Sequence, residues 1–112
     1  MKYSESLKKH RDFQNVYRHG NSCANKYLVM YVMDNQTNKN RLGISVSKKV
    51  GNSIVRHRLT RLIRESYRLQ EDMFSSGRDI VVIARGAAKG KNYRDIESAL
   101  IHLARLHDIY KG

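Results

Sequence analysis

The segment KKVGNSIVRHRLTRLIRESYR, residues 48–68, holds the side chains best suited to binding a polyanion. At about 100° per residue, four of them share one arc of roughly 60° on a helix: His57, Arg61, Arg64 and Arg68. The apolar side chains are expected on the opposite side: Val55, Leu59, Leu62, Ile63 and Leu69. Arginine can bind phosphate bidentately and stack on bases, so this row predicts a nucleic-acid interface.

Net charge supports the same interpretation. The chain has 112 residues, 22 Lys and Arg against 10 Asp and Glu, and a formal charge of +12. Residues 41–68 contain eight basic residues and a single acid, Glu65. The eight are Arg41, Lys48, Lys49, Arg56, Arg58, Arg61, Arg64 and Arg68. Nearby acids normally balance an idle solvated face, so the excess favours a nucleic acid first and an anionic membrane second.

A second constellation is aromatic. Phe13, Tyr17 and Tyr31 are widely spaced, and Tyr31 is expected on the same side of a sheet as the small Ser45 and Ser47. Aromatic side chains beside small ones would form a shallow trough in which single-stranded nucleic acid can stack. In the alternative interpretation, Phe13 and Tyr17 only hold the first helix on the sheet.

No pattern of hydrolytic or metal-binding residues accompanies these features. The five histidines are scattered, without an HExxH motif or a phosphate-binding loop. Cys23 is the only cysteine and is expected to be a small packing residue. Asp79 and Asp95 are expected to mark the start of a strand and a helix cap. We therefore predict no catalytic and no metal-binding residue, which argues against a stand-alone nuclease.

Hydrophobic spacing predicts the elements that hold these residues. Helices are expected at 10–19, at 53–70 and after Asn92, and strands at 27–33, 41–47 and 80–84. The first helix should stop at Gly20, and Asn52 or Ser53 should cap the second. The first two strands should form an antiparallel hairpin, and the apolar third strand should be central.

The predicted core uses one face of each element. Leu28, Met30 and Val32 alternate along one strand, and Leu42, Ile44 and Val46 along the next, away from Gly43, Ser45 and Ser47. The last helix should bury one stripe: Ile96, Ala99, Leu100, Leu103 and Leu106. The fold class is α+β, an αββαβα sandwich of helices on a small mixed sheet. With no long linker and no repeat, residues 1–112 form one domain.

Three segments, DFQNVYRHGNSCANKYLVMY, RLGISVSKKVGNSIVRHRLTRLIRE and DIVVIAR, resemble the bacterial ribonuclease P protein family in order and spacing. The resemblance covers roughly residues 7–106. It implies the protein subunit of an endoribonuclease that removes the 5′ leader of precursor tRNA, with catalysis by an RNA subunit and none by the isolated chain. It also implies a left-handed β–α–β crossover, against the general right-handed rule.

The resemblance assigns residues to two sites. The leader site would contain Phe13, Tyr17, Tyr31, Ser45 and Ser47. The catalytic RNA would contact Lys48, Lys49, Asn52, Arg56, His57, Arg58, Arg61, Arg64 and Arg68. His57 stands where the family usually has asparagine, and Thr60 where it usually has lysine. Histidine charges with falling pH, and Thr60 removes one phosphate partner, so contacts near these positions should differ.

The expected partners are therefore ribonuclease P RNA and precursor tRNA, with no membrane and no protein partner. The protein should bind no cofactor stably, and Mg²⁺ is expected for the RNA-containing holoenzyme. The polar N-terminus lacks a signal-peptide pattern, which makes the cytoplasm the expected location. The alternative is another basic RNA-binding protein of the ribosome or translation apparatus. An anionic-membrane binder would need an exposed apolar helix face, which the pattern does not predict.

Overall fold

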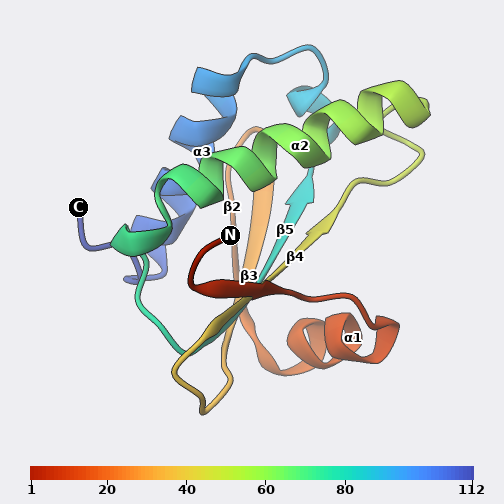
Figure 1. Cartoon of the computed structure of the whole chain (residues 1–112). Helices are drawn as coiled ribbons and strands as arrows, with labels where there is room; N and C mark the ends of the chain where they lie inside the picture. The colour runs from red at the N-terminus through yellow and green to blue at the C-terminus, as the bar shows by residue number, and fades with distance from the viewer.

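The computed structural model describes residues 1–112 as one five-stranded sheet between two layers of helix (Figure 1). Helices α2 (Ser53–Leu69) and α3 (Tyr93–Leu106) cover one face, and α1 (His10–His19) lies against the other. The α+β fold class and the three helices are confirmed. None of the helices combines the length and the hydrophobicity that a membrane-spanning segment needs.

The sheet has the strand order β1-β4-β5-β3-β2. Its strands are β1 (Ser4–Ser6), β2 (Asn21–Ala24), β3 (Leu28–Asp34), β4 (Asn40–Ser45) and β5 (Arg78–Ala84). β5 pairs in parallel with β4 and antiparallel with β3, so the prediction of a central strand in a mixed sheet is confirmed. Helix α2 makes the crossover between β4 and β5, and the left hand expected for it stays a prediction.

The predicted hairpin between β3 and β4 is wrong. These strands do not pair, because β5 inserts between them and hydrogen-bonds to both. Two edge strands were also missed, so the order is βαβββαβα rather than αββαβα. β1 and β2, with the sequences SES and NSCA, are short and lack apolar alternation. The strand predicted at 41–47 ends at Ser45, which leaves Ser47 in the following loop.

The main core lies between the sheet and helices α2 and α3. Leu28, Met30, Leu59, Ile63 and Tyr67 are all fully buried there. A smaller cluster of Leu7, Val16 and Val81 lies under α1 on the other face. This second cluster fixes α1 on the sheet and thereby positions the aromatic side chains of that helix.

Two residues predicted in the core are exposed: Leu69 at 52% and Leu106 at 55%. Both end their helices. After α3 the chain reverses at Asp108, which has a φ of 58°, and Ile109 takes the buried place instead. The apolar spacing therefore continues to the end of each helix, beyond the last buried residues, which are Tyr67 in α2 and Ala104 in α3.

The predicted helix ends are confirmed. The side chain of Asn52 caps α2 by accepting from the Val55 amide at 3.0 Å, and Asn92 caps α3 by accepting from Asp95 at 2.9 Å. α1 stops at Gly20, where a β-carbon would lie 2.6 Å from the Val16 carbonyl oxygen. Only glycine allows the chain to pass this closely into β2.

Candidate nucleic-acid interface

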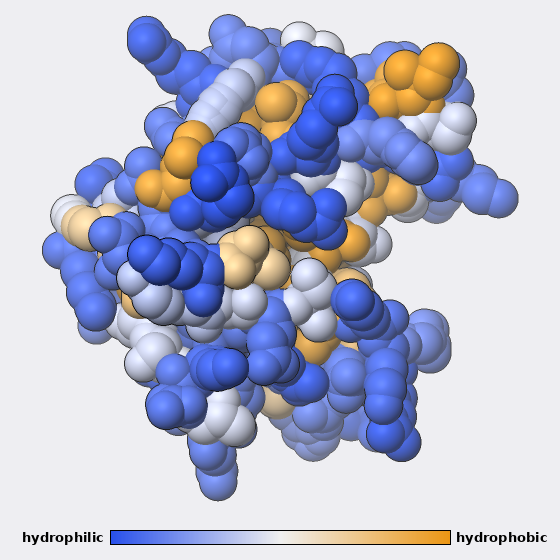
Figure 2. All heavy atoms as spheres, in the orientation of Figure 1, coloured by the Kyte–Doolittle hydropathy of each residue, from blue (hydrophilic) through white to orange (hydrophobic).

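The outer side of α2 displays the predicted cationic row. His57, Arg61, Arg64 and Arg68 are all exposed, while Leu59 and Ile63 are buried against the sheet. Hydrophilic side chains crowd along this helix, with a few apolar atoms visible between them (Figure 2). Helix α2 therefore presents a row of exposed polar side chains that a phosphate backbone can follow.

The basic residues around this row differ in their exposure to solvent. Lys48 and Lys49 are exposed in the turn that leads into α2. Arg56 and Arg58 are half-buried on the sides of the helix, and Nε of Arg56 lies buried without an acceptor in the chain.

Arg68 is already paired. Its guanidinium forms an ion pair with Glu65, including a bond of 3.0 Å from Nε to Oε2. This partner lowers the pKa of Glu65 from its ordinary value. The C-terminal end of the row is thus less cationic than its N-terminal end, which contains His57 and Arg61.

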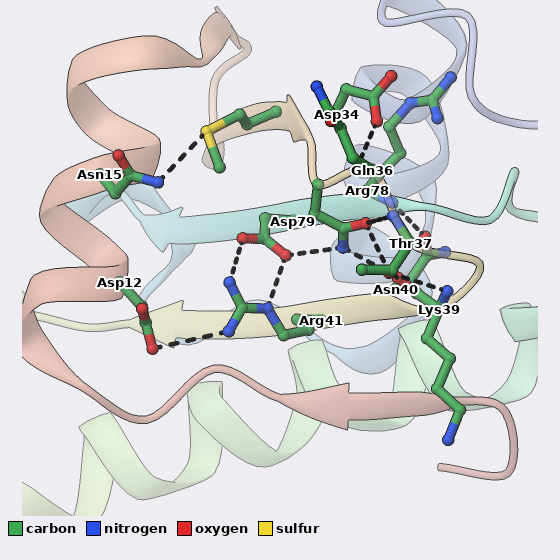
Figure 3. A network of polar contacts seen from close by, with 12 residues as sticks. Asp12, Asn15, Asp34, Gln36, Thr37, Lys39, Asn40, Arg41, Arg78 and Asp79 are labelled. Carbon is green, nitrogen blue, oxygen red and sulfur yellow. Dashed lines mark hydrogen bonds and ion pairs between the residues drawn. The ribbon is translucent and has the colours of Figure 1, made fainter.

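Arg41 does not belong to the cationic surface, although the charge count included it. Its Nε and Nη2 atoms donate to the carboxylate of Asp79 at 2.8 and 2.6 Å, and Nη1 lies 3.7 Å from Asp12 (Figure 3). Asp79 is fully buried and also accepts from the Asn35 amide. These contacts form an internal charge network between β4, β5 and α1. The guanidinium of Arg41 therefore stabilises the fold and is not available to bind RNA.

A groove lies beside α1, on the opposite side of the sheet from α2. It has a volume of about 450 Å³. Its lining residues come from α1, the segment before it and β4: Lys8, His10, Phe13, Gln14, Tyr17, Ile44 and Ser45. The aromatic rings, the small Ser45 and the cationic Lys8 together give a site that fits a nucleobase and its phosphate.

The aromatic residues form one chain of rings. The ring centroids of Phe13 and Tyr17 are 6.4 Å apart, and those of Tyr17 and Tyr31 are 5.0 Å apart and nearly perpendicular. Burial raises the pKa of the Tyr17 hydroxyl. Tyr31 supports Tyr17 from β3 and does not itself line the groove.

The structure thus brings together three of the five predicted leader-site residues, Phe13, Tyr17 and Ser45. Ser47, in the loop after β4, is not among the lining residues. Sequence reasoning missed Lys8, His10, Gln14 and Ile44, the last of which was predicted to face the core. The helical spacing of His10, Gln14 and Tyr17, which is i, i+4, i+7, could have found two of them.

The residues needed for a metal centre within the protein do not gather anywhere in the structure. No three His, Cys, Asp or Glu side chains form a group that could hold a metal ion. Asp95 lies in the first turn of α3, whose cap is Asn92, and Asp79 holds Arg41. Both aspartates therefore have contacts that belong to the fold, and neither is part of a metal site.

Comparison with known proteins agrees with this geometry. The family model described as Ribonuclease P matches residues 1–107. The chain belongs to the ribonuclease P protein family. The "Ribonuclease P protein component" of Lachnoclostridium phytofermentans is 66% identical, over 95% of this chain and 91% of that protein.

Two solved ribonuclease P proteins share the fold. The protein from Staphylococcus aureus has a TM-score of 0.88 and 37% identity, covering 96% of this chain and 98% of that one. The protein from Thermotoga maritima has a TM-score of 0.83 and 32% identity, covering 90% and 96%. The chain therefore has the fold of these two ribonuclease P proteins.

Proposed function

We propose that this ribonuclease P protein binds the catalytic RNA along α2 and the 5′ leader of precursor tRNA in the groove beside α1. In this way it assists the endonucleolytic removal of the leader that leaves the mature tRNA 5′ end. The observation that carries the proposal is the division of the surface into two sites. A cationic helix lies on one side of the sheet, and an aromatic groove on the other.

The α2 surface suits a folded RNA rather than a small ligand. Its exposed cations follow the helix axis from Lys48 and Lys49 to Arg64, and only Arg68 has an acidic partner. Neighbouring cations without acids repel one another, and bound phosphates relieve that repulsion. Such contacts release counterions and make binding depend steeply on salt.

The groove suits a single strand. Tyr17 and Phe13 offer ring surfaces, and the exposed Lys8 and His10 line the same groove. Stacking tolerates any base, which a site for leaders of differing sequence requires. The leader would thus be held without strict dependence on its sequence.

Catalysis is assigned to the RNA subunit. No group of three His, Cys, Asp or Glu side chains could hold a metal ion, so we assign binding and charge compensation to the chain. The residues present do not fit a resident Mg²⁺, and RNA phosphates would hold the Mg²⁺ of the holoenzyme. The alternative of a ribosomal or other translation protein is not favoured, because family model, relatives and solved neighbours agree.

Salt-dependent binding to a bacterial ribonuclease P RNA tests the α2 assignment. Arg61→Ala or Arg64→Ala should weaken binding and reduce the slope of log affinity against log salt by less than about one unit. Lys39→Ala is the charge-matched control, because Lys39 lies in the β3–β4 loop beside Glu5, away from α2. If both arginine variants keep the wild-type affinity and slope, α2 does not bind the RNA.

A further inference from the structure

The most exposed large apolar side chain of the protein lies on the cationic face of α2. Ile54, in the first turn of the helix, is 77% exposed. At about 100° per residue it lies about 20° around the helix axis from Arg61 and about 60° from His57. The row therefore begins with an isoleucine whose side chain points where the arginines point.

The fold gives no reason for an isoleucine here. The neighbouring Val55 is the residue that packs against the core. A β-carbon on Gly51 would lie 2.7 Å from Cγ1 of Val55, so the loop before α2 closes tightly over this valine. With Val55 turned inward, Ile54 must point outward. In an exposed helix position isoleucine is also a weaker helix former than alanine, lysine or arginine.

From this position we infer that Ile54 packs against the apolar surface of a nucleoside, a ribose or a base, in the RNA bound along α2. The inference rests on the proposed function of that face. Phosphates held by Lys48, Lys49 and Arg61 would bring the sugars between them over the first turn of α2. Double-stranded RNA displays riboses in a wide, shallow minor groove, and loops display whole bases.

An apolar contact has a different signature from a charge contact. Burying Ile54 against a nucleoside releases no counterions, so its contribution should be independent of salt. The arginines of the same face should instead change the salt slope. The two kinds of contact can therefore be separated in one titration series.

The experiment measures affinity of the full-length chain for a bacterial ribonuclease P RNA from low to high salt. Ile54→Ala should bind about three- to tenfold more weakly at every salt concentration, with an unchanged slope. Ile54→Lys should also bind no tighter than wild type, although it adds a positive charge to the RNA-binding face.

Leu69 provides the matched control. It is also exposed on α2, but it lies at the other end of the helix, about 22 Å along the axis, and about 100° around the axis from Arg68. Leu69→Ala should leave the affinity unchanged. Melting curves of the Ile54 variants should match wild type, since Ile54 has no place in the core.

Two results separate the possible failures. If Ile54→Ala binds like wild type and Ile54→Lys binds more tightly, while Arg61→Ala weakens binding, then the side chain lies in solvent and this inference is wrong. If Arg61→Ala also has no effect, the α2 face does not bind RNA, and the proposed function fails with it.

Discussion

The ring of Phe13 lies directly on Gly43, so closely that a β-carbon at residue 43 would be 2.7 Å from Cζ of the ring. Phe13 on α1 is thereby held against β4, and it also lines the groove. Phe13 therefore anchors α1 on the sheet, and the same ring forms part of the groove wall, where contact with the leader stays a prediction. Gly43 is buried, and its lack of a side chain leaves the space that the Phe13 ring occupies.

Substituting Gly43→Ala should displace Phe13 and with it the wall of the groove. The added methyl group would also come within 3.1 Å of Leu7, so overpacking should cost about 1–3 kcal/mol of stability. We expect weaker binding of precursor tRNA with a long leader and little change for a leaderless substrate. Denaturant unfolding and leader-dependent affinity measure the two effects; a variant with wild-type stability would contradict the close packing.

Tyr17→Ala should reduce affinity only for substrates that carry a leader of several nucleotides. The expected loss is about 1–3 kcal/mol for each base that stacks on the ring. Tyr31→Ala should act in the same direction but less strongly, because Tyr31 supports Tyr17 from behind. Tyr3→Ala is the control, since Tyr3 is 58% exposed and does not line the groove. Equal losses for long-leader and leaderless substrates would remove Tyr17 from the leader site.

Arg41→Met should destabilise the protein without altering its RNA binding. Removing the guanidinium leaves the buried Asp79 carboxylate without its cation, at a cost of about 3 kcal/mol. Arg41→Met/Asp79→Asn should recover part of this loss, since the uncompensated charge is gone. The free energy of unfolding tests the pairing, and the salt slope of RNA binding should match wild type. A reduced slope in the folded variant would show that Arg41 contacts RNA after all.

Ionisation of Glu71 should make the free energy of unfolding depend on pH in the acidic range. Burial alone would raise the pKa of Glu71, but hydrogen bonds outweigh it, including those from the Lys2 and Tyr3 amides at 2.8 and 2.9 Å, and hold the pKa below its ordinary value. The stabilisation is therefore complete above the unfolded-state pKa of about 4.3 and is lost as pH falls through the lower folded-state pKa.

Glu71→Gln should remove this contribution. Unfolding free energies measured between about pH 6 and pH 3 should fall less steeply for the variant than for wild type. Asp72→Asn, at the exposed neighbouring position, serves as the control. Parallel pH profiles for wild type and Glu71→Gln would show that Glu71 does not fasten the N-terminus through its charge.

The features that were predicted best from the sequence are those that depend on a single helix or strand. The faces of α2 follow from the spacing of Leu59 and Ile63, and its start follows from Asn52, because both depend on neighbours within a few residues. Strand β5 was predicted as central because its apolar run requires cover on both faces. The predicted burial of Leu69 was wrong, because helical spacing cannot show how far the sheet extends beneath a helix.

The predictions that were wrong concern contacts between residues far apart in the sequence. The short turn between β3 and β4 suggested a hairpin, but the strand that fills the space between them follows 33 residues after β4 ends, at Arg78. The same separation hid the Arg41–Asp79 pair, so an arginine that pairs with a buried carboxylate was counted among the free surface charges. The groove was predicted from its rings, while the contribution of Lys8 depends on how the segment before α1 approaches β4.

The most direct test of the account is reconstitution with a bacterial ribonuclease P RNA. Cleavage of precursor tRNA is measured with and without the chain over a range of Mg²⁺ concentrations. A +12 protein beside phosphates lessens the repulsion between catalytic RNA and substrate, as divalent ions also do. We expect strong stimulation at low Mg²⁺ that shrinks as Mg²⁺ rises, and no cleavage by the chain alone. A stimulation that stays constant across the Mg²⁺ range, or metal-dependent cleavage by RNA-free protein, would contradict the account.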